Sequence, residues 1–389
     1  MKRNLLHTPE GVRDIYNGEC AQKLHIQNCI HDVINKYGYN DIQTPSFEFF
    51  DIFNKERGSV ASKYMFKLFD REGNTLVLRP DMTPSIARCA AKYFENDTDP
   101  IRLCYVGNTF VNNSRYQGRL KETTQAGCEL INDNSITADV EMVATLIESI
   151  LSTGLTEFQV EIGHVGFFKG LVAEAGLDDE SATELREVIR NKNIFRVGEL
   201  VDEGNESFYM LPQLFGGVEI LEKAKTITTN EIALDAIKHL EKVFELLKVY
   251  GFEKYVTVDL GMLSELDYYT GIIFQGYTYD VGEPIANGGR YDKLIGQFGN
   301  DKASIGFCIT IDLLHQALKR QNIEMYCSEK AKLLVCNENE LEMGIKLVTY
   351  FRNQNVKAVI VTKIPDKTDN YDEVIEVSED VLERYGIQR

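Results

Sequence analysis

The sequence has no long apolar run, which argues against a helix that crosses a membrane. Its longest apolar runs have the length of a β-strand, well below the roughly 18 residues of a membrane span. The N-terminal segment MKRNLLHTPEGVRD starts basic, but only Leu5 and Leu6 follow before it turns polar. A signal peptide needs a longer apolar stretch. We therefore expect a cytoplasmic protein without membrane contact.

The cysteines and histidines lack the spacings of metal or redox motifs. The closest cysteines are nine residues apart, so no CxxC pair exists. Most of them lie in apolar strand or helix patterns, where buried free thiols in a reducing cytoplasm are the expected state. The six histidines are scattered, and no two have the i, i+4 spacing of a helical zinc site. The sequence therefore predicts no metal site.

Common phosphate-binding and catalytic motifs are missing as well. There is no GxxxxGK[ST] and no GxGxxG that opens a helix. Spacing alone supports no Ser-His-Asp or Cys-His set. We accordingly predict no catalytic residue and no cofactor.

Positive charge is scarce. Lys and Arg number 42 against 60 Asp and Glu, which gives a formal net charge of −18 and a pI near 4.9. Nucleic-acid binding draws much of its affinity from basic side chains that neutralise phosphates, so tRNA is not an expected partner. Basic protein partners or small cationic ligands suit this chain better.

The composition is that of a folded globular protein, with 43% hydrophobic and 26% charged residues. Hydrophobic periodicity predicts a helix over about 21–37. Two short apolar runs within 65–78 flank a turn that contains Gly73, which is typical of a β-hairpin. A second hairpin is predicted from 101–112 and 119–131.

The middle of the chain alternates between strand and helix patterns. A helix near 140–151 precedes a strand at 158–162, and residues 165–250 are mostly helical in pattern. Strand patterns then return at 255–260, 272–279 and 304–310. We interpret the helical block as an insertion into a mostly antiparallel β framework. The predicted fold class is α+β, and the first domain covers residues 1–325.

A smaller α/β domain is predicted for residues 331–389, after a polar break. Its pattern is strand, helix, strand, strand. The segment has 59 residues, with 8 Lys or Arg against 11 Asp or Glu, so it is not basic.

Polar residues punctuate the strands in three segments. In the first, 78–88, Asp81 and Thr83 lie between a strand and a helix. Thr83 followed by Pro84 fits a helix N-cap, which does not exclude a ligand role. Asp81 could equally pair with Arg79.

The second segment, 105–131, is strand-like but carries Arg119, Gln125 and Glu129. Gln125 and Glu129 are an even number of residues apart and therefore share one face of a regular strand. Taken alone, such a face is usually solvated.

The third segment, 264–299, is rich in tyrosine, including Tyr268 and Tyr269, around the bend Asn287-Gly288-Gly289. Glycines let backbone approach a ligand, and tyrosines add hydroxyls to apolar walls. Tyrosine-rich strands are also common core material.

Together these segments resemble the catalytic core of histidyl-tRNA synthetases, which are class II aminoacyl-tRNA synthetases. The resemblance covers residues 1 to about 320. It rests on five motifs in the family's order: TPEGVRD at 8–14, the motif 1 stretch 38–45, the motif 2 hairpin 105–131, LDYYTG at 266–271 and GGRYD at 288–292. It implies an antiparallel sheet flanked by helices with a helical insertion, assembled as a dimer. By the same resemblance, 331–389 corresponds to part of an anticodon-binding domain, truncated relative to the family.

The departures from the family's pattern lie at its ATP site. The motif 2 arginine that follows phenylalanine is Val111 here, and the nearby glutamate is Asn113. Ser264 stands where the histidyl enzymes place an arginine before LDYY, and Leu313 replaces the motif 3 arginine. At about 2 kcal/mol each, three lost charge-assisted contacts cost about 6 kcal/mol, or about 10⁴-fold. We therefore expect no adenylation activity.

The amino-acid side of the site is kept. The resemblance implies that Asp81 and Thr83 meet the ammonium of bound histidine and that Arg119 and Gln125 lie near its carboxylate. Glu129 and Tyr268 would face the imidazole, with Tyr269 beside it. These residue types also suit a ligand that offers a cation, an anion and a polar ring.

A synthetase-like chain with this combination is similar to the regulatory subunits of short-form ATP phosphoribosyltransferase. That resemblance implies a non-catalytic subunit that binds a separate short catalytic subunit and confers histidine feedback on the first step of histidine biosynthesis. The alternatives are an active histidyl-tRNA synthetase, which would show ATP-pyrophosphate exchange, and a tRNA- or histidine-sensing module.

Overall fold

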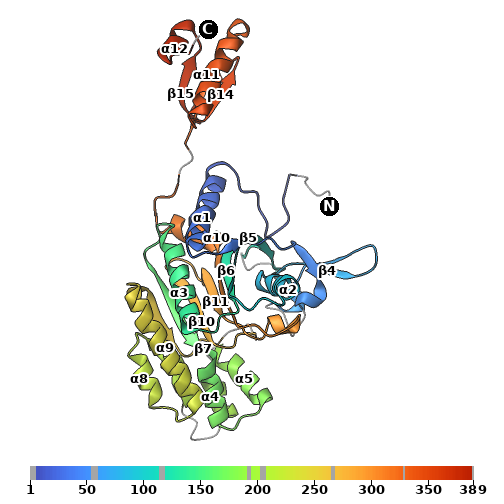
Figure 1. Ribbon diagram of the computed structural model, residues 1–389, viewed down its shortest axis with the longest axis vertical. Coiled ribbons are helices and arrows are strands. Elements are labelled where there is room, and N and C mark those ends of the chain that lie inside the picture. The colour runs from blue at the N-terminus through green and yellow to red at the C-terminus, as the bar shows by residue number, and fades with distance from the viewer. Residues whose placement is uncertain are drawn as a thin grey trace. The chain divides into compact units, whose positions relative to one another are not determined.

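The computed structural model describes residues 6–53, 60–113, 119–190, 194–201, 207–263, 268–326 and 329–387 (Figure 1). The chain divides into two compact units, Met1–Met325 and Tyr326–Arg389.

A mixed sheet forms the centre of the first unit. Within the described residues it has nine strands in the order β1-β5-β6-β12-β11-β10-β7-β9-β8. Their bounds are β1 (Asn40–Asp41), β5 (Ile101–Phe110), β6 (Glu122–Ile131), β7 (Phe158–His164), β8 (Phe215–Gly216), β9 (Val256–Asp259), β10 (Ile272–Thr278), β11 (Ala286–Arg290) and β12 (Ser304–Thr310). The pairs β1–β5 and β7–β9 are parallel, and the other neighbours are antiparallel. The predicted α+β fold class is confirmed.

The hairpin of β5 and β6 is the longest pairing of this sheet. It is the hairpin predicted from 101–112 and 119–131, and its register runs from Ile101 opposite Ile131 to Phe110 opposite Glu122. Because successive side chains alternate between faces, Cys128 and Leu130 point to one face. Gln125, Gly127 and Glu129 point to the other.

Helices cover both faces of the sheet (Figure 1). On one face α1 (Asn17–Lys36), α3 (Ile136–Leu151) and α10 (Ile311–Arg320) pack against one another and against β5, β6 and β12. On the other, α2 (Thr83–Tyr93) packs through Met82 and Ile86 near Tyr105 and Tyr291. The candidate site lies on this second face.

The described part of residues 165–250 is mostly helical, as predicted, and includes one short strand, β8, which joins the edge of the main sheet through β9. The segment contains α4 (Val165–Glu174), α5 (Asp179–Arg190), α6 (Ile194–Leu200), α7 (Ser207–Met210), α8 (Ile220–Lys225) and α9 (Glu231–Val249). The side chain of Asn230 caps α9 by accepting from the amide of Ile232 at 2.9 Å. The apolar stripe of α9 packs against α3, α4 and α8.

Two smaller sheets complete the fold. The first joins β2 (Phe47–Phe49), β4 (Thr75–Leu78) and β3 (Lys67–Phe69); its β3–β4 pair is the predicted 65–78 hairpin. The second belongs to the Tyr326–Arg389 unit and orders β14 (Ala358–Val361), β13 (Ala331–Val335) and β15 (Tyr371–Glu376) in parallel. Together with α11 (Leu341–Asn353), these strands follow the predicted chain order of strand, helix, strand, strand. It adds α12 (Glu379–Arg384), a six-residue helix too short to show a clear period.

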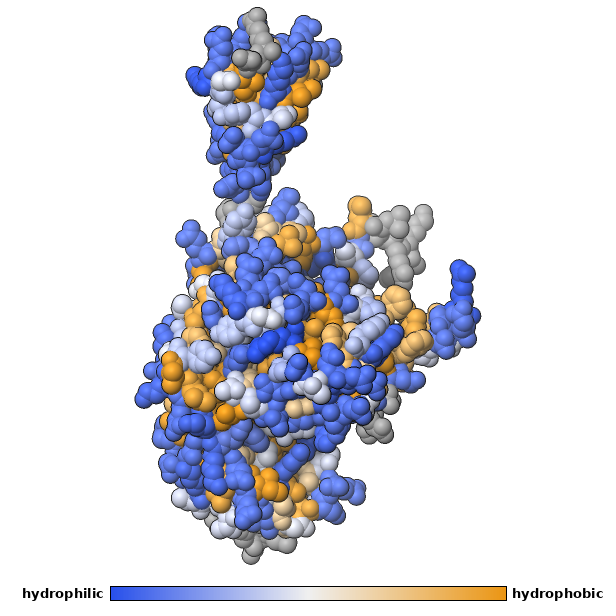
Figure 2. Space-filling view, viewed as in Figure 1, coloured by the Kyte–Doolittle hydropathy of each residue, from blue (hydrophilic) through white to orange (hydrophobic). Residues whose placement is uncertain are grey.

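Hydrophilic residues cover most of the face drawn in Figure 2, with small apolar groups between them. No helix in the described part of the chain is long and apolar enough to cross a bilayer.

A buried ion pair joins β11 to α3. The guanidinium of Arg290 donates to Asp139 Oδ1 from Nε at 2.9 Å and from Nη2 at 2.5 Å. Its Nη1 donates to the carbonyl of Asp133 at 3.0 Å and to Asp292 at 3.2 Å. The second oxygen of Asp139 lies 2.8 Å from Nε2 of His239 on α9. Three elements therefore meet at one carboxylate that is 1% exposed.

We expect Arg290→Met to lower the free energy of unfolding by about 3–5 kcal/mol, because it leaves the Asp139 carboxylate buried without its main cation. Urea denaturation followed by circular dichroism measures this. Lys238→Met is the control: Lys238 pairs with Asp235 on the exposed side of α9, and its loss should cost less than about 1 kcal/mol. Equal small effects of both substitutions would contradict the role given to Arg290.

Candidate functional site

A cavity of about 580 Å³ opens on the α2 face of the main sheet. It is lined by all seven side chains that the sequence assigns to a ligand site: Asp81, Thr83, Arg119, Gln125, Glu129, Tyr268 and Tyr269. Asp81 and Thr83 lie at the start of α2, and Gln125 and Glu129 lie on β6. Arg119 precedes β6, and the two tyrosines precede β10. The chain thus brings three distant segments to one place.

Glu129 lies at the floor of this cavity and is 1% exposed. Its carboxylate accepts from the hydroxyl of Thr83 at 2.9 Å and from the hydroxyl of Tyr291 at 2.5 Å. Gly306, its partner on β12, leaves room for it: a Cβ at that position would lie 1.7 Å from Oε2 of Glu129. Burial raises the pKa of Glu129 to about 8, with the charge of Asp81 adding to the rise and the two hydroxyls opposing it.

Thr83 does not cap helix α2 as the sequence pattern indicated. The helix N-cap is Met82, and no side chain caps there. Asp81 Oδ1 accepts from the backbone amide of Thr83 at 3.3 Å, and the Thr83 hydroxyl donates to Glu129. The Asp81–Arg79 pairing is also wrong, because the guanidinium of Arg79 donates to the carbonyls of Asn108 and Thr44. Backbone carbonyls therefore hold Arg79, and Asp81 lines the cavity.

The two tyrosines form an aromatic wall. The rings of Tyr268 and Tyr269 meet edge to face, with centroids 4.9 Å apart, and Tyr268 meets Tyr291 in the same manner at 6.0 Å. The hydroxyl of Tyr268 donates to Asp81 Oδ2 at 3.4 Å. Burial raises the pKa of both hydroxyls well above the ordinary value, so they remain protonated donors.

Gln125 lines the cavity and has a buried side-chain oxygen. Its Oε1 has no hydrogen-bond partner among the described atoms, and a buried carbonyl in that state costs free energy until a donor arrives. A ligand that donates a hydrogen bond there would remove this cost.

Sequence reasoning missed several other lining residues. Gln275 and Tyr277 on β10 join Asn287 on β11 in a hydrogen-bonded row: Gln275 donates to Asn287 at 3.0 Å and accepts from Tyr277 at 2.7 Å. Arg190 of α5 and Glu283 also line the cavity. Period-2 alternation along β10 could have indicated Gln275, but no local pattern indicates Arg190 or Glu283.

Arg119 marks the boundary between this cavity and a second one of about 800 Å³. Its Nε donates to Glu283 Oε1 at 3.0 Å, and both side chains are about half exposed. An exposed pair of this kind contributes little to stability, so a ligand carboxylate can compete with Glu283 for Arg119.

The second cavity contains three of the four positions assigned to a degenerate ATP site: Val111, Asn113 and Leu313. Val111 and Leu313 have no side-chain hydrogen-bond donor, and Asn113 donates to the carbonyl of Leu120 at 3.3 Å. The fourth position, Ser264, lies outside the described residues. These three positions therefore offer no cation to a polyphosphate, while Arg119, Lys121 and Arg320 line other parts of the same cavity.

Comparisons with known proteins agree on one relationship. Residues 11–314 match the family model of histidyl-tRNA synthetase. The chain is 41% identical to the ATP phosphoribosyltransferase regulatory subunit of Acetivibrio thermocellus, over 86% of this chain and 81% of the relative. It is 38% identical to that of Clostridium acetobutylicum, over 91% and 89%.

A solved structure supports the same relationship. The ATP phosphoribosyltransferase regulatory subunit/histidyl-tRNA synthetase from Bacillus halodurans superposes with a TM-score of 0.88 at 32% identity. The match covers 97% of this chain and 99% of that structure.

The raised pKa of Glu129 predicts how stability depends on pH. A carboxyl with a folded pKa near 8 and an ordinary unfolded pKa stabilises the fold at low pH, and this contribution is lost as pH rises towards 8. Between pH 5.5 and 8, wild type should therefore lose up to about 3 kcal/mol relative to Glu129→Gln, which does not titrate. Urea unfolding of the ligand-free protein at the two pH values measures the difference. Glu245→Gln, at an exposed position of α9, should behave as wild type; equal pH dependence of all three proteins would refute the assignment.

Proposed function

This chain belongs to the family of ATP phosphoribosyltransferase regulatory subunits, and we propose that it senses L-histidine in the Glu129 cavity on behalf of a separate catalytic subunit. The observation that carries the proposal is the contrast between the two cavities. One gathers two carboxylates and tyrosine hydroxyls around a buried floor beside Arg119. The other shares Arg119 and also contains Lys121 and Arg320, but it has Val111, Asn113 and Leu313 at the positions assigned to ATP.

The cavity suits each part of histidine. Asp81 would pair with the ammonium group, with the hydroxyl of Tyr268 beside it. Arg119 would bind the carboxylate in place of Glu283, and the side-chain amide of Gln125 would lie near the same carboxylate. A charged ligand loses its hydration when it enters a buried site. Side chains of opposite charge and hydrogen-bonding groups must therefore replace the lost water contacts for the ligand to bind.

The imidazole would lie against Glu129 and Tyr268, with Tyr269 beside it. A carboxyl with a pKa near 8 holds its proton at neutral pH and can donate to an imidazole nitrogen; once ionised it accepts from the N–H. Glu129 can therefore bind a neutral imidazole in either state. An aliphatic side chain would leave this buried carboxyl without a partner, which favours histidine over other amino acids.

The role in the complex is non-catalytic in this proposal. The chain would act in the cytoplasm, join a short ATP phosphoribosyltransferase catalytic subunit and confer activity and histidine inhibition on it. Lining residues of the sensing cavity lie between Val60 and Cys308, so we assign sensing to the first unit, residues 1–325.

We also propose that the chain self-associates as a dimer through the motif 1 region, 38–45, and its neighbours. Large apolar side chains are exposed on adjoining elements, including Leu24 on α1 and Phe47 and Phe49 on β2. Such side chains are typical of protein contact surfaces when they occur together.

Asp81→Ala should separate sensing from assembly. Mixed with the catalytic subunit of the same organism, wild type should co-elute with it, switch on phosphoribosyl transfer to ATP and make that reaction sensitive to histidine. The variant should assemble and activate normally but bind histidine about 30-fold more weakly, because about 2 kcal/mol of charge-assisted bonding is lost. Calorimetry with the purified chain and inhibition curves with the complex measure this.

Asp235→Ala, at an exposed position of α9, is the matched control and should keep wild-type inhibition. Histidine binding and substrate binding should weaken each other by the same factor. Full histidine inhibition of the Asp81→Ala complex would refute the site, and failure to co-elute would refute the partner.

ATP-pyrophosphate exchange tests the alternative of an active histidyl-tRNA synthetase. Since Val111, Ser264 and Leu313 stand at the positions of ATP-binding arginines, the purified chain should show no histidine-dependent exchange above background. An exchange rate that disappears in Arg119→Ala would show instead that the site is catalytic.

A further inference from the structure

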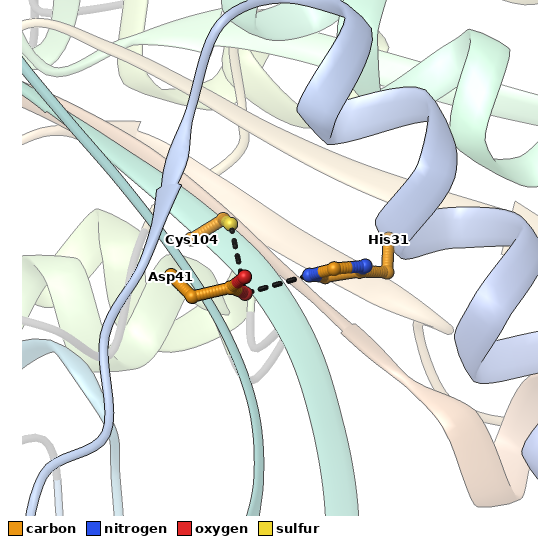
Figure 3. Close-up of side chains that lie close together, drawn as sticks. All are labelled: His31, Asp41 and Cys104. Carbon is orange, nitrogen blue, oxygen red and sulfur yellow. Dashed lines mark hydrogen bonds and ion pairs between the residues drawn. The ribbon is translucent and has the colours of Figure 1, made fainter.

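Three side chains with metal-binding atoms lie close together and line neither of the two cavities described above: His31, Asp41 and Cys104 (Figure 3). Their ligand atoms all lie within 4.8 Å of one another. The imidazole Nε2 of His31 is 2.6 Å from the carboxylate of Asp41, and the thiol of Cys104 is 3.6 Å from it. Figure 3 shows all three side chains pointing to a common centre.

The backbone places these three residues independently of their side-chain contacts. Asp41 and Cys104 are Cα partners in the parallel pair β1–β5, so their side chains leave the sheet side by side. His31 lies on α1, which packs against β5 and β6. A ligand set held by a helix and two paired strands is pre-organised, which favours binding of an ion over a chance contact.

The donor set suits zinc. A thiolate, an imidazole nitrogen and a carboxylate oxygen are its usual protein ligands, at about 2.0–2.3 Å from the ion. Ligand atoms around such an ion lie about 3–4 Å apart, so the sulfur–oxygen separation already fits. His31 and Asp41 must separate by about 1 Å, which the exposed carboxylate of Asp41 allows, since its side chain is 69% exposed.

Asn35 supplies the supporting contact that a metal-bound imidazole needs. It lies one helical turn after His31, and its amide is 3.1 Å from Nδ1 of that ring. With Nε2 on the ion, Nδ1–H requires an acceptor, which the amide oxygen of Asn35 provides after rotation of the amide. The same amide lies 3.7 Å from the Cys104 sulfur.

We propose that His31, Asp41 and Cys104 form a Zn²⁺ site, with water as the fourth ligand. The thiol of Cys104 loses its proton to solvent when the ion binds, and no oxidation is involved. The ion would link α1 to the edge pair β1–β5. In the single chain Cys104 is fully buried and Asp41 is exposed, so the ion enters from the Asp41 side. Because Asp41 belongs to the 38–45 region proposed for self-association, the site would border that interface. This site is independent of the proposed histidine site.

Zinc titration of the chelator-treated full chain tests the proposal. Calorimetry should show one strong Zn²⁺ site per chain, and zinc should raise the melting temperature by mass action. Co²⁺ in its place should give the charge-transfer absorption of a cobalt–thiolate bond. Cys104→Ala and Asp41→Asn should each weaken zinc binding at least about 100-fold, and Cys104→Ala should abolish the cobalt–thiolate band. Asp41→Asn changes an exposed side chain, so it tests the site even if Cys104→Ala folds poorly.

Cys29→Ala is the matched control. Cys29 lies on α1, as His31 does, and its sulfur is 3.5 Å from Nε2 of His25. Cys29 and His25 together offer a metal ion only two ligand atoms. This variant should bind zinc as wild type does. Absence of a strong zinc site in wild type, or its loss in Cys29→Ala and not in Asp41→Asn, would overturn the proposal.

Discussion

The buried pair of Arg290 and Asp139 is the interaction on which the arrangement of the site depends. It fixes the end of β11 against α3 on one face of the main sheet, and His239 extends the contact to α9. The next residue, Tyr291, points to the opposite face because side chains alternate along an extended chain. There its hydroxyl donates to Glu129. An ion pair beneath the sheet thus determines where the floor of the cavity above it lies.

A buried carboxyl is costly, and this chain meets that cost with neutral donors. Thr83 and Tyr291 donate to Glu129. A neighbouring cation is not needed, because burial raises the pKa of Glu129 to about 8 and keeps it largely protonated at neutral pH. The same sheet in a synthetase would also have to hold ATP, for which Val111 and Leu313 are unsuited. One fold can therefore serve catalysis or sensing, and the side chains around the cavities decide between them.

Much of this site could be predicted because it depends on local patterns. Period-2 alternation placed Gln125 and Glu129 on one strand face, and the hairpins followed from short apolar runs around turns. The Thr83 cap was wrong because the helix begins at Thr83 itself, with Met82 as the N-cap. The Thr83 hydroxyl donates to Glu129, 46 residues away. Arg190 and Glu283 were missed because they reach the cavity only through packing of separate elements.

The sequence by itself determined the order of helices and strands, the synthetase-like framework and the absence of arginine at 111, 264 and 313, the positions that the resemblance assigns to ATP, since these depend on residue type and local spacing. Only the tertiary structure decided the pKa of Glu129, which depends on burial by distant segments, and the pairing of Arg119 with Glu283. It also brought His31, Asp41 and Cys104 together. Linear spacing could not indicate that cluster, because β1 and β5 pair across some sixty residues of intervening chain.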